Sequence, residues 1–407
     1  MARRKRQNFP GLVRAGVDGF KHMTTTVFSS QSADFEILLW TVIFMTGAGA
    51  VMVFSSSYIY SVIKSNDMFG ELRSQVLGIV GGALLLIVFA FLKPTTVQRL
   101  ANWGLALGLG LQAVVLFTGF GASVNGNRNW LDLGIITIQP SEFIKVAMIV
   151  YLANMISVER MYSREDYRFW AAPTGVFAII ALFVGVFGSD AGTTIIMAFI
   201  LYGMYFIAGL PGKYLAWVTI LGVVAMPLLM MSNASRRGRV MAWLFPSEPD
   251  PNGYNWQSEH AKWAFASGGP FGVGLGNSKM KWSWLPEAQN DFIFAIIGEE
   301  WGMVGALVTI GLFVSLGIVM FRIAKRTQDP YQRLVVYGVT FWIMGQAFIN
   351  ISVVLSMFPV LGVNLPLISA GGSSMLATLI AIGIVLGIER NNSLKPALRV
   401  VRSAARR

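Results

Sequence analysis

The chain has 407 residues, of which 55% are hydrophobic and only 13% are charged, whereas charged residues make up about 25% of a typical soluble domain. This composition excludes an ordinary soluble protein and indicates an integral membrane protein. The net charge of +12 would suggest nucleic-acid binding in a soluble protein, but here Lys and Arg lie mostly in tails and short loops, so we expect membrane topology to explain them and expect no nucleic-acid partner.

Two rare residue types limit the chemistry further. The sequence has no Cys and only two His. This excludes disulfides, thiolate metal sites and a cysteine nucleophile, and it argues against a histidine-rich zinc centre.

The predicted elements begin with a basic tail over residues 1–35, which lacks the apolar core of a cleavable signal peptide. The fold predicted for residues 36–389 is an all-α, polytopic bundle of about ten transmembrane helices of ~20 residues. The expected spans are 37–57, 76–92, 101–119, 140–157, 171–188, 191–209, 214–231, 302–321, 333–356 and 372–388. The second and fifth are short, so each is either tilted or partly re-entrant. A basic C-terminal tail follows over residues 390–407.

The distribution of Lys and Arg predicts the orientation of the bundle. The side that holds both termini is much richer in these residues than the opposite side, so both termini are expected to be cytoplasmic. A long extracytoplasmic loop over residues 232–290 then joins the seventh and eighth spans. It is rich in Trp, and disordered segments are poor in aromatic residues, so we expect it to be folded onto the bundle.

The segment 120–139 and the span after it carry the first candidate site residues. Arg128, in "NGNRNW", suits phosphate recognition. Glu142 and Lys145 stand three residues apart near the start of the fourth span and therefore share a helix face. Charged groups inside a membrane span pair with each other or line a polar cavity, and the sequence favours neither alternative.

Three arginines follow the seventh span in "SRRGRVMAW". Arg236, Arg237 and Arg239 could bind a pyrophosphate in bidentate fashion or could bind lipid head groups. Downstream, the glycine-rich segment 266–282 permits close approach of the backbone and ends near Lys281, a candidate substrate-binding residue. It lacks the Walker lysine–serine pattern, so nucleotide binding is weakly supported.

Three carboxylates surround the start of the eighth span. Asp291 is expected at the outer membrane interface, either as a helix-terminal charge or as a general base whose proton affinity is raised by partial desolvation. Glu299 and Glu300 lie near a predicted helix break at the glycines of "IIGEEWGMVG", where structural and functional roles are equally open. Near the last span, Ser373 in "LPLISAGGSS" is a further candidate for substrate binding.

These segments together resemble the SEDS family (shape, elongation, division and sporulation). The resemblance is carried, in chain order, by "NGNRNWLDLG", "IQPSEFIK", "SDAGTT", "SRRGRVMAW", "ASGGPFGVGLGNSKMK", "LPEAQNDFIFAIIGEE" and "LPLISAGGSS". The "LPEA" lead before Asp291 is more similar to the septal branch of the family than to the elongation branch. Two departures are that Gln289–Asn290 stands where the family usually has His, and Ala370 where it usually has Tyr.

The resemblance implies a membrane glycosyltransferase that polymerises lipid II into peptidoglycan strands during cell division. The family's essential carboxylate falls on Asp291, and its cavity residues fall on Arg128, Glu142 and Lys145. The family also implies Mg²⁺ or Mn²⁺, with Asp291 the candidate ligand, and no organic cofactor. It implies lipid II, membrane lipid, a class B penicillin-binding protein and other division proteins as partners, in the bacterial cytoplasmic membrane. The alternatives are a lipid II flippase and a division scaffold without chemistry.

Overall fold

A computed structural model of the protein describes residues 32–65, 70–124, 127–132, 137–158, 163–231, 233–246, 250 and 253–404. The predicted N-terminal tail lies outside these residues up to position 31. Helices dominate the described chain, and the predicted all-α, polytopic membrane fold is confirmed.

Nine helices in the described part of the chain are long and apolar enough to cross a membrane. They are α2 (Ala33–Ser65), α3 (Gly70–Phe91), α4 (Pro94–Phe117), α6 (Tyr167–Ala181) continued by the π-helix η1 (Leu182–Phe187), α7 (Ala191–Ala208), α8 (Gly212–Met231), α12 (Gly302–Arg326), α13 (Pro330–Val354) and α14 (Gly372–Ala404). The two short predicted spans are α3 and α6–η1. Both are continuous and of spanning length, so neither is re-entrant; their first turns, "GELRS" and "YRFW", are too polar or aromatic to extend an apolar run.

The remaining predicted span is α5 (Pro140–Ile156), a helix of 17 residues that packs against α4 and α13. A helix of this length is about 26 Å long, shorter than the ~30 Å hydrocarbon core of a bilayer. Glu142 and Lys145 in its first turns are both buried. The helix therefore begins inside the bundle, and these two charged side chains lie deeper than the ends of the neighbouring helices.

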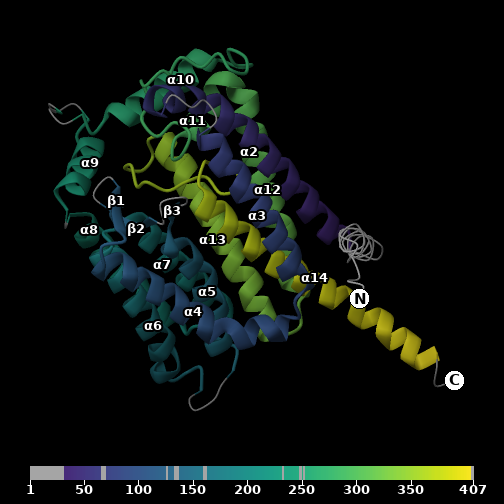
Figure 1. Ribbon diagram of the computed structural model, residues 1–407. Helices are drawn as coiled ribbons and strands as arrows, with labels where there is room; N and C mark the ends of the chain where they lie inside the picture. Colours follow the sequence, from purple (N-terminus) through teal and green to yellow (C-terminus); the bar gives the residue numbers. More distant parts are fainter. Residues whose placement is uncertain are drawn as a thin grey trace, which may run out of the picture.

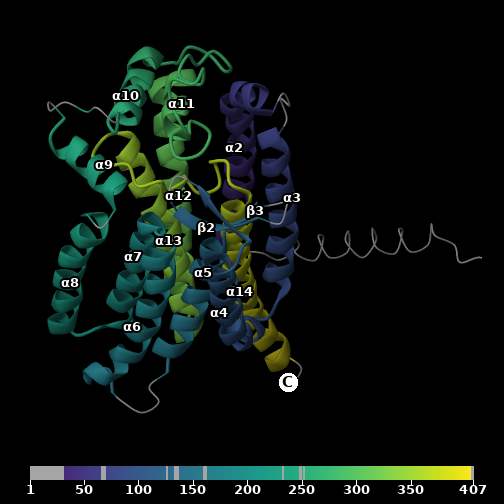
Figure 2. The same cartoon turned by 60° about the vertical axis from the view of Figure 1, so that its left-hand side comes forward.

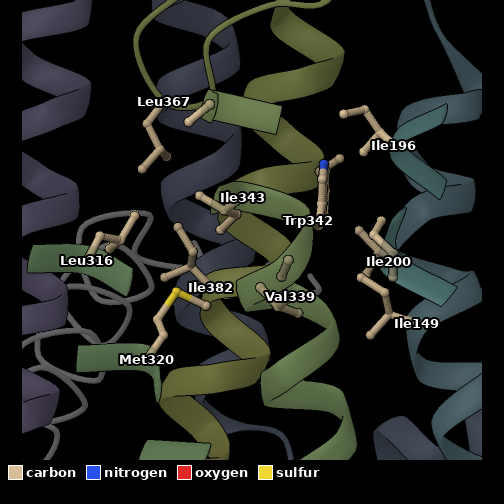
Figure 3. Close-up of a cluster of buried hydrophobic side chains, with 14 of the residues drawn as sticks. Ile149, Ile196, Ile200, Leu316, Met320, Val339, Trp342, Ile343, Leu367 and Ile382 are labelled. Carbon is tan, nitrogen blue, oxygen red and sulfur yellow. The ribbon is translucent and has the colours of Figure 1, made fainter. Parts of the chain in front are cut away.

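Helices α13 and α14 form the centre of the bundle. Within the most apolar 18-residue stretch of each helix, 67% of the residues are buried in α13 and 78% in α14. Figure 1 shows α14 crossing the molecule beside α3 and α13. Their contact with α5, α7 and α12 is filled by branched aliphatic side chains around Trp342, including Ile149, Ile200, Val339 and Ile343 (Figure 3). Helix α8 lies at the edge of the bundle. Only 6% of its most apolar 18-residue stretch is buried, and its main neighbours are α7 and α9 (Figure 2).

One end of the bundle carries the irregular structure, and we call it the α10 end. It holds the short helices α9 (Ala234–Leu244), α10 (Trp256–Gly268) and α11 (Ile293–Glu300). The predicted loop 232–290 thus contains two helices, and α10 packs on α11, α12 and α13. A small antiparallel sheet, with strand order β1–β2–β3, is formed by β1 (Gly121–Val124), β2 (Asn127–Asp132) and β3 (Thr137–Ile138), which the sequence did not predict.

The opposite end of the bundle is closed by ionic contacts. The buried Asp34 carboxylate, in the first turn of α2, pairs with Arg322 at 2.5 Å and with Arg326 at 2.6 Å. Ser32 donates to Glu389 of α14 at 2.5 Å. The start of α2 is therefore tied to the end of α12 and to the middle of α14.

Candidate active site

A polar cavity of about 400 Å³ opens at the α10 end of the bundle. Its walls come from β2, the start of α5, the turn between η1 and α7, α9, the turn before α11 and the loop before α14. Most of the predicted site residues line it, namely Glu142, Lys145, Arg236, Arg239, Asp291 and Ser373. The chain folds so that segments more than two hundred residues apart meet around one space.

Asp291 follows a tight turn that begins at Glu287. The backbone of Glu287 is in the left-handed region (φ 57°), and its carbonyl accepts hydrogen bonds from Asn290 N at 3.0 Å and Phe292 N at 3.2 Å. Asn350 of α13 donates from Nδ2 to the Asp291 carbonyl at 2.7 Å. Phe292, the next residue, is fully buried. The backbone of Asp291 is therefore fixed from three sides.

The loop before α14 also holds this turn. Ser369 Oγ donates to the Asn290 carbonyl at 2.6 Å, and Ala370 N donates to the Gln289 carbonyl at 2.9 Å. By contrast, the described residues give the Asp291 carboxylate no hydrogen-bond donor, and Gly362 lies opposite its Oδ2. The site thus has a rigid backbone that presents a free carboxylate to the cavity.

The surroundings of Asp291 raise its pKa from 3.8 to about 7. Burial is the largest cause, because it disfavours the charged form. The carboxylates of Glu287 and Asp190 raise the pKa further, and the guanidinium of Arg239 lowers it. A carboxyl group with a pKa near neutrality can accept a proton and release it again at physiological pH.

Gln289 and Asn290, which stand where the family usually has His, both make contacts in the turn before Asp291. Asn290 donates from Nδ2 to Glu287 Oε2 at 2.6 Å. This bond holds the Glu287 carboxylate in the cavity wall, close enough to act on the pKa of Asp291. Gln289 is buried and contributes its carbonyl to the contact with Ala370. The Gln289–Asn290 pair therefore shapes the turn that presents Asp291.

Glu142 and Lys145 form a buried ion pair at the bottom of the cavity. Lys145 Nζ donates to Glu142 Oε1 and to Gln346 Oε1, at 2.9 Å in each case. It also lies 4.7 Å from the centre of the Trp342 ring. Glu142 Oε2 has no hydrogen-bond partner among the described residues. The sequence left open whether Glu142 and Lys145 pair with each other or line a polar cavity. The structure shows both, because the ion pair lies in the wall of the cavity.

The three arginines of α9 divide by helix phase. Positions 236 and 239 share a face, whereas position 237 points elsewhere. Arg236 donates to the carbonyls of Leu229 and Ser189, at 3.1 Å in both cases, and burial lowers its pKa. Arg239 lines the cavity without a salt bridge to any described residue, and Arg237 is exposed outside it. Arg239 is therefore the guanidinium most available to an anionic ligand.

Besides Arg237, two more predicted residues are not brought to the cavity. Arg128 lies on β2, where side chains alternate between faces: Asn129 and Leu131 are buried, and Arg128 is exposed. The Arg128 guanidinium donates to the Thr118 carbonyl at 3.0 Å. Lys281 is buried elsewhere and pairs with Glu300 at 3.2 Å. Its ammonium also donates to the Gly276 carbonyl at 2.5 Å.

Glu299 and Glu300 belong to a separate buried network. Glu299 accepts hydrogen bonds from the Ser278 hydroxyl and from the backbone N–H groups of Lys279 and Met280. Glu300 accepts from Ser55 of α2 at 2.7 Å and from Lys281. Both carboxylates are fully buried and satisfied, which indicates a structural role. Asp291 is not part of this network.

Several residues of the cavity are not among those predicted from the sequence. Asp190 lies in the short turn between η1 and α7, accepts from Thr193 N at 2.9 Å, and has its pKa raised by burial. Glu287 and Gln346 also line the cavity. The motif "SDAGTT" marked Asp190 as an unusual charge between two apolar runs, but nothing in the sequence indicated that Gln346, inside a span, faces the same space.

Comparisons with known proteins agree on one relationship. The family model described as "Cell cycle protein", which covers FtsW, RodA and SpoVE, matches residues 36–394. The probable peptidoglycan glycosyltransferase FtsW of Mycobacterium tuberculosis is 39% identical over 361 residues, covering 88% of this chain and 68% of the relative. Stage V sporulation protein E of Bacillus subtilis is 33% identical, covering 90% and 99%.

Solved structures show the same fold. A chain from the structure described as "Structural coordination of polymerization and crosslinking by a peptidoglycan synthase complex" has 25% identity and a TM-score of 0.68, covering 87% of this chain and 98% of that one. Rod shape determining protein RodA of Thermus thermophilus has 26% identity and a TM-score of 0.64, covering 87% and 96%. Together with the bundle of membrane-spanning helices and the polar cavity at one end of it, these matches show that the chain belongs to the FtsW/RodA/SpoVE family of cell cycle proteins.

Proposed function

We propose that the protein is a peptidoglycan glycosyltransferase of cell division, which polymerises lipid II with Asp291 as the general base. The observation that carries this proposal is the free Asp291 carboxylate, with a pKa of about 7, in a cavity that also presents Arg239. The names of the curated relatives support the activity.

The chemistry fits the side chains present. Asp291 takes the proton from the acceptor sugar hydroxyl, whose oxygen forms the new bond to the anomeric carbon of the donor. The bond from that carbon to the lipid pyrophosphate breaks, and the pyrophosphate leaves as an anion, so a second carboxylic acid is not required. Arg239 is positioned to bind the leaving anion, since a guanidinium pairs with phosphate in bidentate fashion.

A divalent cation is part of the proposal. The described residues contain no group of three His, Cys, Asp or Glu that could hold a metal. Mg²⁺ in phosphoryl sites is commonly held by one or two carboxylates plus substrate phosphates, and Asp190 and Asp291, which both line the cavity, fit that pattern. The cation would neutralise charge on the pyrophosphate when bound.

The proposed location follows from the same site. In this proposal the α10 end lies outside the cytoplasm and both termini lie inside it, and the charge bias of the loops supports this orientation. A class B penicillin-binding protein is the proposed transpeptidase partner, since one structural relative comes from a synthase complex that couples polymerisation to crosslinking.

A polymerisation assay tests the function. Purified protein with its transpeptidase, lipid II and Mg²⁺ should form glycan strands, and Asp291→Ala should fold normally and form none. Undiminished polymerisation by Asp291→Ala would refute the general-base role. Translocation of lipid II across proteoliposome membranes without any polymer would instead assign the protein as a flippase. If neither polymerisation nor translocation were observed, the scaffold hypothesis would remain.

A further inference from the structure

Outside the catalytic cavity, the α10 end carries a stack of aromatic rings. His260 is 4.0 Å from Trp256 and 6.0 Å from Trp284 between ring centroids, with interplanar angles of 27° and 11°. Trp256 and Trp284 lie 6.3 Å apart at 16°. The Trp256 indole N–H donates to the Trp284 carbonyl at 2.7 Å, and its carbonyl contacts His260 Nδ1 at 2.8 Å. The rings are thus held nearly parallel by hydrogen bonds as well as by packing.

The histidine ring is buried and the two tryptophan rings are open. His260 is only 1% exposed, whereas Trp256 is 43% and Trp284 is 55% exposed. The polar handle of Trp256 is already used within the stack, so its exposed surface is indole carbon. Trp256 and Trp284 thus present fixed aromatic surface at this end of the molecule, and exposed apolar patches mark ligand-binding or interaction sites.

A second cavity, of about 460 Å³, joins this stack to the catalytic cavity. It is lined by Arg239, Gly253, Tyr254, Trp256, Gln257, Pro286 and Glu287. Arg239, Gln257 and Glu287 also line the catalytic cavity. The two cavities therefore adjoin each other at these three side chains, which puts Trp256 next to the cavity that holds Asp291.

We propose that this second cavity and its aromatic stack, the Trp256–Trp284 shelf, bind the sugar units of the glycan strand next to the reaction centre. The inference rests on the proposed function and adds a saccharide subsite to it. A pyranose ring presents C–H groups on its faces and hydroxyl or amide groups on its edge. It can pack a face on an indole while Gln257, Glu287 and Tyr254 bond its edge.

The composition of the shelf favours a saccharide over lipid. Acyl chains need a continuous apolar surface, but the wall between Trp256 and Asp291 is made of charged and amide side chains. Trp282 provides a contrast, since it is 62% exposed and has no ring contact with a described residue. It represents an ordinary exposed tryptophan from the same loop.

A binding measurement tests the shelf without requiring turnover. The full-length protein in detergent is titrated with chitotetraose, a soluble β-1,4-linked N-acetylglucosamine tetramer, by saturation-transfer NMR and calorimetry. Trp256→Ala and Trp284→Ala should each bind it about ten-fold more weakly, a change of ~1.4 kcal/mol. Trp284→Phe, which keeps a ring, should retain most of the affinity, and Trp282→Ala should bind as the wild type does.

The polymer made from lipid II gives a second readout. Loss of the shelf should shorten the glycan strands on gels, because a strand held less firmly is released sooner. Unchanged tetramer affinity in Trp256→Ala and Trp284→Ala would overturn the proposal, as would equal loss in Trp282→Ala. If these variants instead lost only the transpeptidase, the face would belong to a protein. Wild-type protein that binds the tetramer through the shelf but makes no polymer would refute the proposed function alone.

Discussion

At the scale of single residues, the pKa of Asp291 has a direct kinetic consequence. A general base must be unprotonated, and this carboxyl has a pKa of about 7 in the folded protein. The polymerisation rate should therefore rise with pH and level off above about pH 7. This rise would occur far above the ordinary carboxyl pKa of 3.8. Initial rates at fixed lipid II and Mg²⁺ measure the profile. A rate independent of pH from 5 to 8 would exclude Asp291 as the titrating base.

The same carboxyl affects stability with the opposite trend. Since its pKa is higher folded than unfolded, the folded protein binds the proton more tightly, and this contribution to stability is lost as pH rises through about 7. Asp291→Asn cannot ionise and has no such loss. Its melting temperature in detergent should exceed that of the wild type by more at pH 8 than at pH 5. Equal differences at the two pH values would contradict the raised pKa.

Arg239 and Arg237 form a matched pair on one helix. Arg239 lines both cavities, and Arg237 is exposed outside them. Arg239→Ala should lower the polymerisation rate at least about ten-fold, because a charge-assisted contact to phosphate contributes ~1.5–3 kcal/mol. Arg237→Ala should stay within about two-fold of the wild type. Comparable losses in both variants would point to general surface charge instead of a specific contact.

The sequence predicted residue types better than residue directions. Asp291, Glu142 and Lys145 stood out because charges are rare in apolar runs, and they meet in one cavity. Arg128 and Arg237 were chosen by their motifs, yet strand alternation and helix phase turn both away. Lys281 could not be placed either, since its partner Glu300 is recognised only once the glycine-rich loop folds over α11. A linear motif does not specify these directions.

At the scale of elements, the glycine-rich loop joins two helix ends. Val273 N and Gly274 N donate to the carbonyls of Glu299 and Glu300 at the end of α11, at 3.0 Å each. At the start of α12, Met303 N donates to the Gly269 carbonyl at 2.9 Å. Backbone groups that a helix break leaves unpaired are thus satisfied. The glycines hold structure and do not form a phosphate site.

Gly272 and Gly276 allow this role to be tested. Both have positive φ, 83° and 84°, but a Cβ at position 272 would collide with the Glu300 carbonyl, whereas one at position 276 meets nothing within 4 Å. Gly276→Ala should cost only the strain of the left-handed backbone, about 1–2 kcal/mol. Gly272→Ala should lower the melting temperature clearly further. Equal melting temperatures for the two variants would show that the contact with α11 does not stabilise the fold.

Element prediction succeeded where apolar runs were long. The spans were found from hydropathy, and the break at Trp301–Gly302 was found from glycines. The small sheet was missed because β1, β2 and β3 have only 4, 6 and 2 residues. Such strands are too short for a period of two to be recognised.

At the scale of the whole molecule, the absence of Cys makes the proposed orientation easy to test. Lys279→Cys lies in the exposed loop at the α10 end, and Gln328→Cys lies between α12 and α13 at the opposite end. A membrane-impermeant maleimide should label Lys279→Cys in intact cells and Gln328→Cys only after permeabilisation. The reverse pattern would invert the topology and place the cavity in the cytoplasm.

Helix α2 is joined to α12 through Asp34 with Arg322 and Arg326, and to α11 through Ser55 with Glu300. The two attachment points are about 32 Å apart along the helix. Side-chain contacts therefore hold α2 at two levels, whereas α8 contacts mainly its neighbours in sequence, α7 and α9. The turn that presents Asp291 is held by Asn350 of α13 and by Ser369 and Ala370 of the loop before α14, and none of these contacts involves α8. A displacement of α8 on substrate binding would therefore break none of the contacts that position Asp291.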